Sequence, residues 1–154
     1  MSDFYFLEQD YEALQAQIRF VTRMVIENGQ EMGRSCGEGA ETFHDNFAWE
    51  EGERQQRMWT RRLRELVHVR DRARVVLPAG AADRVCLGAS VRYEDIDTGE
   101  VLTARVGSYM TFDGSNTMSY NSPIGRLLMG ARAGEERFGT VGGQSRAFRV
   151  LEVR

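Results

Sequence analysis

Residues 37–51, GEGAETFHDNFAWEE, gather the side chains of this chain that are best suited to chemistry. Five carboxylates fall within these fifteen residues: Glu38, Glu41, Asp45, Glu50 and Glu51. His44 and nearby Cys36 add two further potential metal ligands, but their spacing matches no zinc-binding pattern. An intrinsic metal site is therefore not favoured. The simplest alternative is that the acids only form a solvated cap at a bend of the chain.

The residues before this segment follow the repeat of a coiled coil. Apolar residues recur in alternating steps of four and three, with a single failure at Asn28: Leu7, Tyr11, Leu14, Ile18, Val21, Val25 and Met32. Such a 3.5-residue repeat predicts a helix over roughly residues 7–32, about 40 Å long. We expect Gly33, Gly37 and Gly39 to end this helix, because each glycine weakens it by about 1 kcal/mol.

A second helix is expected to begin near Asp45-Asn46, both good N-cap residues, and to end before LPAGAAD. Its apolar positions are Trp49, Met58, Trp59, Leu63, Leu66 and Ala73. Two long helices joined by a short bend bury their apolar stripes by packing antiparallel. The acidic segment, at about residues 35–46, is then the tip of a helical hairpin.

Residues 54–74 hold 8 arginines and 2 acids, whereas residues 1–53 hold 3 arginines and 12 acids. We expect many of these arginines to pair with acids of the first helix, each pair contributing little. The alternative is a basic patch that faces RNA or an acidic protein surface. The residues of this patch would be Arg54, Arg57, Arg61 and Arg62.

The hydrophobic period changes after residue 84. VCLGASVRYEDI and AFRVLEV alternate as strands do, and DTGE and VGGQ resemble hairpin turns. SPIGRLLMG predicts a short helix with Ser122 as N-cap, Pro123 in the first turn and Gly130 at the C-cap. The expected fold class is α+β: a coiled-coil domain over residues 1–76, a linker over 77–83, and a small antiparallel sheet with one short helix over 84–154.

Composition excludes some classes of protein. No apolar run approaches the length of a membrane span, and the N-terminal residues lack the pattern of a signal peptide. The two cysteines are far apart and lack CxxC spacing, which favours reduced thiols. We therefore expect a cytoplasmic monomer with no membrane partner.

The layout resembles the Gre factors, bacterial proteins that enter the secondary channel of RNA polymerase and stimulate cleavage of backtracked RNA. GASVRYEDIDTGE, NSPIGRLLMGARAGEE and GGQSRAFRVLEV match, in order and spacing, the elements of that family's FKBP-like domain. Asp45-Asn46, Trp49 and Gln55-Gln56 similarly match the start of its second helix. The resemblance implies a coiled-coil hairpin followed by an FKBP-like domain, with bacterial RNA polymerase as partner.

The resemblance also implies that the protein acts on the polymerase and has no catalytic activity of its own. In the family, two tip acids help to hold a weakly bound Mg²⁺ of the polymerase active site, with no intrinsic cofactor. Asp45 with Glu41 is the favoured pair here, and Glu38 with Glu41 is the alternative. Thr42 stands where the family carries its second acid. Cleavage-stimulating and non-cleaving, inhibitory members of the family both remain open.

Other residues acquire roles by the same resemblance. Phe43 and Phe47, beside the tip, are expected either to contact the channel or the nascent RNA 3′ end, or to pack against the neighbouring turn. Asn121, Ser122 and Pro123 match the loop by which the family docks on the polymerase rim, although helix capping alone would also explain the last two.

Two rival classes remain. One is a peptidyl-prolyl isomerase on the FKBP-like fold, which needs a cluster of aromatic residues. The candidates for this cluster are Tyr93, Tyr109, Phe112, Tyr120, Phe138 and Phe148. The other is an interaction module whose coiled coil binds another protein or a second copy of itself.

Overall fold

The structure is a computed structural model that describes residues 2–38, 46–114 and 116–154, with only the backbone for residues 35–38 and 46. Contacts divide the chain into two compact units. The hairpin unit contains residues 13–72, and the sheet unit contains residues 1–12 together with 73–154. This division differs from the expected boundaries at residues 76 and 84, because the first twelve residues pack with the C-terminal half.

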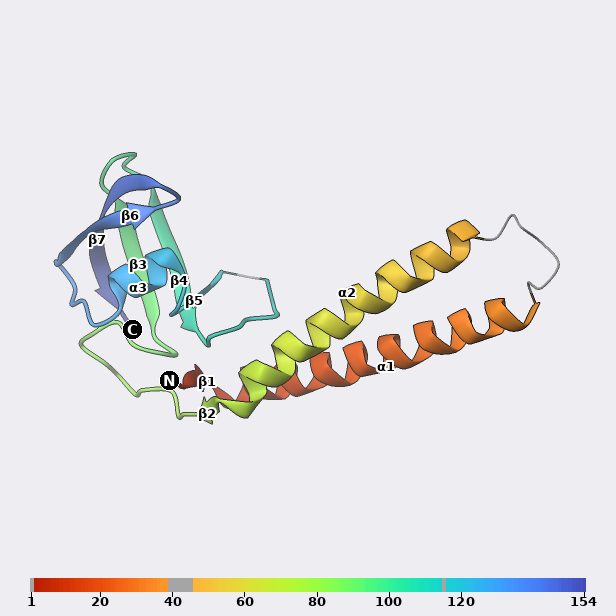
Figure 1. Cartoon of the computed structure of the whole chain (residues 1–154). Helices are drawn as coiled ribbons and strands as arrows, with labels where there is room; N and C mark the ends of the chain where they lie inside the picture. The colour runs from red at the N-terminus through yellow and green to blue at the C-terminus, as the bar shows by residue number, and fades with distance from the viewer. Residues whose placement is uncertain (1, 39–45, 115) are drawn as a thin grey trace. The chain divides into compact units, whose positions relative to one another are not determined.

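The hairpin is built from two long helices, α1 (Glu8–Glu38) and α2 (Asn46–Asp71), which lie side by side and antiparallel (Figure 1). The predicted hairpin is thus confirmed. Its seam buries Leu14, Val21 and Leu66 completely. Burial of each leucine or valine side chain stabilises the packing of α1 against α2 by about 1.5–3 kcal/mol. Beside the seam, the rings of Phe20 and Trp59 meet edge to face, with centroids 6.1 Å apart.

Helix α1 does not end at Gly33 as expected but continues to Glu38. Gly33 is exposed, and a Cβ added to it would meet nothing within 4 Å. A glycine at such a site lowers helix stability by only about 1 kcal/mol, which the helix tolerates. Helix α2 ends at Asp71, so Ala73 does not belong to it.

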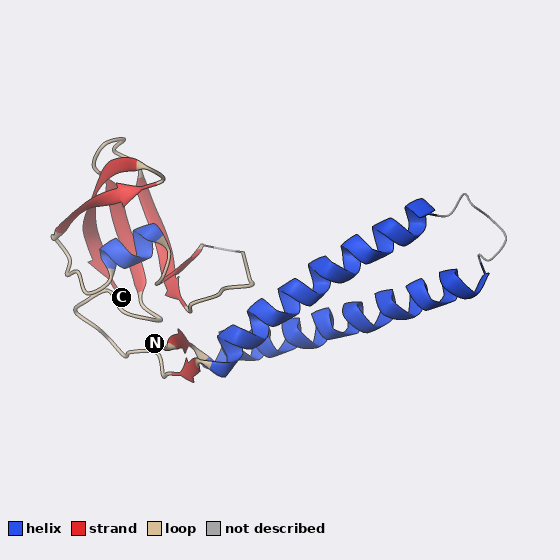
Figure 2. Cartoon of the chain, viewed as in Figure 1, coloured by secondary structure: helices blue, strands red, loops and turns tan. Residues whose placement is uncertain are grey.

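The sheet unit contains a five-stranded sheet of order β5-β4-β3-β7-β6, drawn in red in Figure 2. Its elements are β3 (Ser90–Asp95), β4 (Val101–Gly107), β5 (Thr117–Ser119), α3 (Pro123–Leu128), β6 (Glu136–Val141) and β7 (Gln144–Val153). Strands β4, β3, β7 and β6 pair antiparallel, whereas β5 runs parallel to β4. The predicted sheet with one short helix is confirmed, with this one parallel pairing in addition. Its core centres on Val91, Val106, Leu128, Phe148 and Val150.

Both predicted hairpin turns are present. In the β3–β4 turn, the Asp95 carboxylate accepts hydrogen bonds from the backbone N–H groups of Asp97 and Thr98. In the β6–β7 turn, Gly142 and Gly143 have φ of 60° and 78°. Two consecutive positive φ angles are what a type I′ hairpin turn demands, and glycine meets this demand without strain.

A short parallel pair, β1 (Phe4–Phe6) with β2 (Ala73–Val75), was not expected from the sequence. The buried hydroxyl of Ser108 accepts a hydrogen bond from the backbone N–H of Leu7 at 2.8 Å and donates one to the Asp10 carboxylate. These bonds explain why the first turn of α1 belongs to the sheet unit.

Candidate functional site

The distal end of the hairpin, where α1 ends and α2 begins, is the first candidate site. Glu41, Phe43 and Asp45 lie outside the described residues, as does His44. Glu38 is the last residue of α1, and Asn46, which follows Asp45, is the first residue of α2. The residues that flank this segment, Glu38 and Asn46, therefore end α1 and begin α2, while the predicted acidic tip between them lies outside the described residues.

Phe47, in the first turn of α2, is 79% exposed. Burying a phenylalanine side chain stabilises a protein by about 1.5–3 kcal/mol, and Phe47 does not use this energy within the chain. Its ring is therefore available to a partner. Packing against the neighbouring turn, the alternative for this residue, concerns residues outside the described part of the chain and stays a prediction.

The expected basic patch lies on α2, but its arginines pair differently from the expectation. Each finds an acid three or four residues away on its own helix: Arg54–Glu51, Arg57–Glu53, Arg61–Glu65 and Arg62–Glu65. Among the described residues, the structure thus shows partners of these four arginines on α2 itself, because that spacing brings side chains onto one face of a helix. Such exposed pairs contribute about 0.3–0.5 kcal/mol each and exchange readily for a partner's acids or phosphates.

Part of this basic patch lines a hollow in the surface of α2. An open hollow of about 400 Å³ is lined by Arg57, Met58, Arg61, Arg62 and Glu65. At the N-terminal edge of the patch, a hydrogen bond from Gln55 and then the charge of Arg54 lower the pKa of Glu51. The Glu51 carboxylate is therefore ionised at neutral pH.

In the described part of the chain, no three His, Cys, Asp or Glu side chains come together to hold a metal ion.

The loop before α3 is the second candidate site. The Ser122 hydroxyl accepts a hydrogen bond from the Gly125 N–H at 3.0 Å and donates one to the Ser119 carbonyl oxygen at 2.8 Å. Pro123 is exposed in the first turn of α3. The Arg126 guanidinium donates two hydrogen bonds to the Asn121 side-chain oxygen, at 2.9 and 3.1 Å. The predicted N-cap is thus present, and side-chain hydrogen bonds link this loop to the first turns of α3.

A groove adjoining this loop was not anticipated from the sequence. It has a volume of about 480 Å³ and is lined mainly by apolar side chains of β3, β4, β5, α3 and β6, among them Tyr93, Leu102, Met118 and Ile124. Ser122 and Pro123 form part of its wall. Of the six aromatic residues proposed for an isomerase pocket, Tyr93 alone lines this groove.

None of the helices described here is long and apolar enough to cross a membrane.

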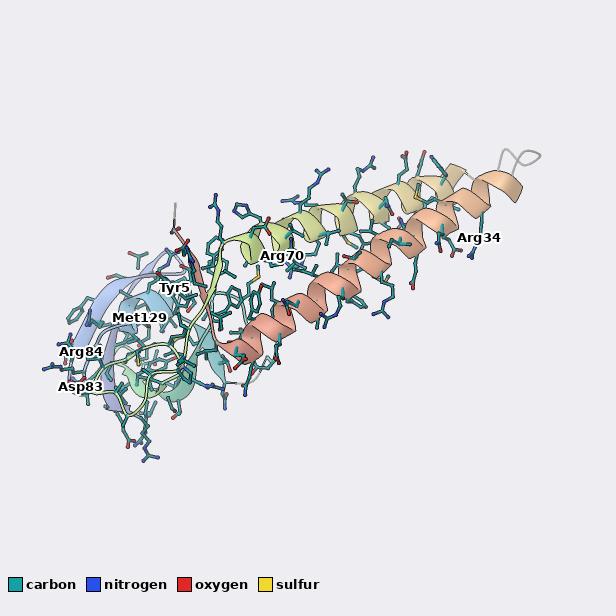
Figure 3. The ribbon with its side chains drawn as sticks, turned by 90° about the horizontal axis from the view of Figure 1, so that it is seen from below. Tyr5, Arg34, Arg70, Asp83, Arg84 and Met129 are labelled. Atoms are coloured by element: carbon teal, nitrogen blue, oxygen red, sulfur yellow. The ribbon has the colours of Figure 1, made fainter. Side chains whose placement is uncertain are left out.

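In the sheet unit, Asp83 forms an ion pair with Arg132 at 3.4 Å, and the backbone of Arg84 forms an isolated antiparallel β-bridge with that of Arg132. Figure 3 shows Asp83, Arg84 and Met129 in this unit. These contacts attach the segment before β3 to the segment between α3 and β6.

A long antiparallel helical hairpin followed by a small curled sheet is the architecture expected of a Gre-type factor. The family model "Transcription elongation factor, GreA/GreB, C-term" matches residues 79–154. The transcription elongation factor GreA of Syntrophobacter fumaroxidans is 33% identical over 154 residues, which cover 96% of this chain and 95% of that relative. GreA of Halorhodospira halophila is 32% identical over 113 residues, covering 71% of this chain and 72% of that protein. The chain belongs to the GreA/GreB family.

The solved structure of GreA factor homolog 1 (Gfh1) of Thermus thermophilus is also similar. It aligns with 99% of each chain at 23% identity and a TM-score of 0.48. That score is too low for this likeness to add to the assignment, which depends on the sequence relatives.

Proposed function

We propose that this protein is a cytoplasmic regulator of transcription elongation that binds bacterial RNA polymerase as a monomer. The observation that carries the proposal is the 33% identity to a GreA factor over nearly the whole of both chains. The identity spans both the hairpin and the sheet unit, so the proposal concerns the complete architecture.

The hairpin has the dimensions of a probe that enters a channel. Helix α1 has 31 residues and α2 has 26, which at 1.5 Å per residue correspond to about 46 and 39 Å. In the proposed complex, the hairpin enters the secondary channel and brings the acidic segment to the polymerase's catalytic centre.

The acids supply carboxylate oxygens to a magnesium ion that belongs to the polymerase. Mg²⁺ keeps most of its waters and accepts one or two carboxylates, so an inserted tip can complete a site that it does not own. Asp45 with Glu41 is the proposed pair, and Glu38 with Glu41 is the alternative. The protein thus modulates a reaction that the polymerase catalyses.

Three further surfaces support binding in this proposal. Exposed Phe47 and the α2 arginines face the channel or the RNA 3′ end, where loosely held guanidinium groups suit phosphates. Asn121, Ser122 and Pro123 form the contact with the rim of the channel. The apolar groove beside these three residues provides area for that contact.

A second version of the function is inhibition without RNA cleavage. Thr42 stands where the resemblance places an acid, and a hydroxyl is a poorer magnesium ligand than a carboxylate. A protein with this tip occupies the channel and blocks it.

One experiment separates the two versions. Stalled elongation complexes are incubated with the wild-type protein, with Asp45→Ala, with Glu41→Ala and with the double variant, and shortened RNA is measured. Glu27→Ala, an exposed acid of α1, serves as matched control. Competition with a cleavage-competent GreA reports binding in the same samples.

Cleavage that is lost in the Asp45 and Glu41 variants while binding persists supports the cleaving version. Wild-type competition without cleavage supports the inhibitory version. If the wild-type protein neither binds the polymerase nor alters elongation, the proposed function is wrong. If the tip variants retain every effect, the assignment of the acids is wrong.

A further inference from the structure

The seam of the hairpin changes character toward its distal end. On α1, Asn28 occupies the position of the heptad repeat that Val21 occupies one heptad earlier and Leu14 two heptads earlier. On α2, the corresponding seam follows the same alternating steps back toward its N-terminus: Leu66, Leu63, Trp59, Gln56 and Gly52. The apolar seam is therefore interrupted by Asn28 on α1, before Met32 resumes the repeat, and it gives way on α2 to Gln56 and Gly52.

These residues contact one another directly. The Asn28 Nδ2 amino group donates one hydrogen bond to the Gln56 side-chain oxygen at 2.8 Å and another to the Gly52 carbonyl oxygen at 3.0 Å. The same amino group also lies 3.7 Å from Met32 Sδ on α1, so its two shorter hydrogen bonds are those to α2. A Cβ added to Gly52 would lie 2.8 Å from Met32 Cγ, so the absence of a side chain there allows the close approach of the two helices.

Directed bonds of this kind select one alignment. Leucine and valine side chains pack in several registers of a coiled coil at similar energy, whereas a polar residue at a seam position finds its partner in one register only. A slip of one residue moves a helix by about 1.5 Å along its axis and turns it by about 100°.

We propose that Asn28, through Gln56 and the Gly52 carbonyl, fixes the register of the distal part of α1 against the distal part of α2 and thereby positions the acidic segment. It is a positioning residue for the proposed function, on which this inference rests. Ten residues separate Asn28 from Glu38, about 15 Å of helix, so the bonds lie close enough to the distal end to control it.

The first test measures the register without the polymerase. Paired spin labels are attached at Arg34→Cys with Arg54→Cys, near the distal end, and at Arg19→Cys with Arg64→Cys in the proximal half. All four sites are exposed, and Arg34 lies near the C-terminal end of α1 in Figure 3. Cys36→Ser and Cys86→Ala remove the native thiols. Pulsed electron paramagnetic resonance then gives the distribution of each label distance.

Asn28→Leu restores the apolar repeat, so the hairpin folds with a melting temperature equal to or above that of the wild type. We expect the distal distance distribution to shift or broaden by at least about 1.5 Å, one residue of slip, and the proximal distribution to stay unchanged. Gln55→Leu is the matched control, because Gln55 hydrogen-bonds to Glu51 within α2. It should leave both distributions unchanged.

The second test measures the effect on the polymerase. Displacing a reacting group by about 1 Å lowers a rate by up to about 100-fold, so Asn28→Leu should reduce the wild-type effect on cleavage or inhibition by tenfold or more. Gln55→Leu should retain it. A stable Asn28→Leu protein with narrow distal distances and full effect would overturn the inference. If the wild-type protein does not act on polymerase, the proposed function fails, and the label distances alone then decide the register.

Discussion

Replacing Ser122 by alanine should destabilise the sheet unit by about 1 kcal/mol. The hydroxyl satisfies the Gly125 N–H at the start of α3, and losing an N-cap serine costs about 0.5–2 kcal/mol. The Ser119 carbonyl loses the hydroxyl but keeps the Ser122 backbone N–H at 3.0 Å, so it is not left unsatisfied. The loss should therefore be near the middle of the range. For a unit of this size it lowers the melting temperature by about 4–8 °C.

Calorimetry of Ser122→Ala and Ser122→Asn separates capping from docking. Asparagine caps helices as well as serine does, so Ser122→Asn should melt near the wild-type temperature. If Ser122 contacts the polymerase, both variants should bind it less tightly at a temperature well below melting. Ser145→Ala, at an exposed serine of β7, is the control for both measurements.

Two results would refute this reasoning. An unchanged melting temperature of Ser122→Ala would show that the hydroxyl does not stabilise α3. Wild-type affinity of both variants would show that Ser122 takes no part in docking. The first result concerns the fold and the second the proposed function, so each can fail alone.

Three further predictions concern the two units separately. Gly125→Ala should cost at least about 1–3 kcal/mol in chemical denaturation, because the added methyl would overlap the Ser119 carbonyl oxygen; a wild-type midpoint would contradict this. A hydrogen bond from Arg146 holds the pKa of Asp95 below its usual range, so its ionised form stabilises the sheet unit above the unfolded pKa of about 3.9. That stabilisation should be lost as pH falls through the folded pKa of Asp95. The free energy of unfolding should therefore fall less steeply at acid pH in Asp95→Asn than in the wild type; equal slopes in the two proteins would exclude this role. Leu66→Ala should cost about 2–5 kcal/mol in urea unfolding followed by helical circular dichroism, and half-exposed Met58→Ala much less; equal losses would disprove a buried seam.

The hairpin could be predicted because its signal repeats along the sequence. Leu14 and Val21 recur at seven residues, and each repeat adds the same evidence for one apolar stripe; the structure buries both of these side chains completely. Gly142-Gly143 in the turn before β7 is similarly informative, since only such a pair adopts two positive φ angles without strain.

Other features gave no such signal. Strand β1 has three residues, too few to display a period, and its partner β2 lies 69 residues further along the chain. The arginine partners were misjudged because net charge by region does not reveal the three- and four-residue spacing that decides pairing on one helix. The groove beside α3 depends on the packing of five separate elements, which no local pattern reports. Asn28 did leave a trace, as the one failure of the repeat, but its partners on α2 became visible only in the structure.

The pairing of β1 with β2 has a consequence for dissecting the molecule. Since residues 1–12 fold with residues 73–154, the sheet unit is discontinuous, and the helical arm is an insertion between its two parts. A fragment starting at residue 77 would leave Ser108 without Leu7 and Asp10. Joining residue 12 to residue 73 by a short glycine-rich tether should instead yield a self-sufficient body. The hairpin unit could then be exchanged, or lengthened by whole heptads, while the sheet unit is left unaltered.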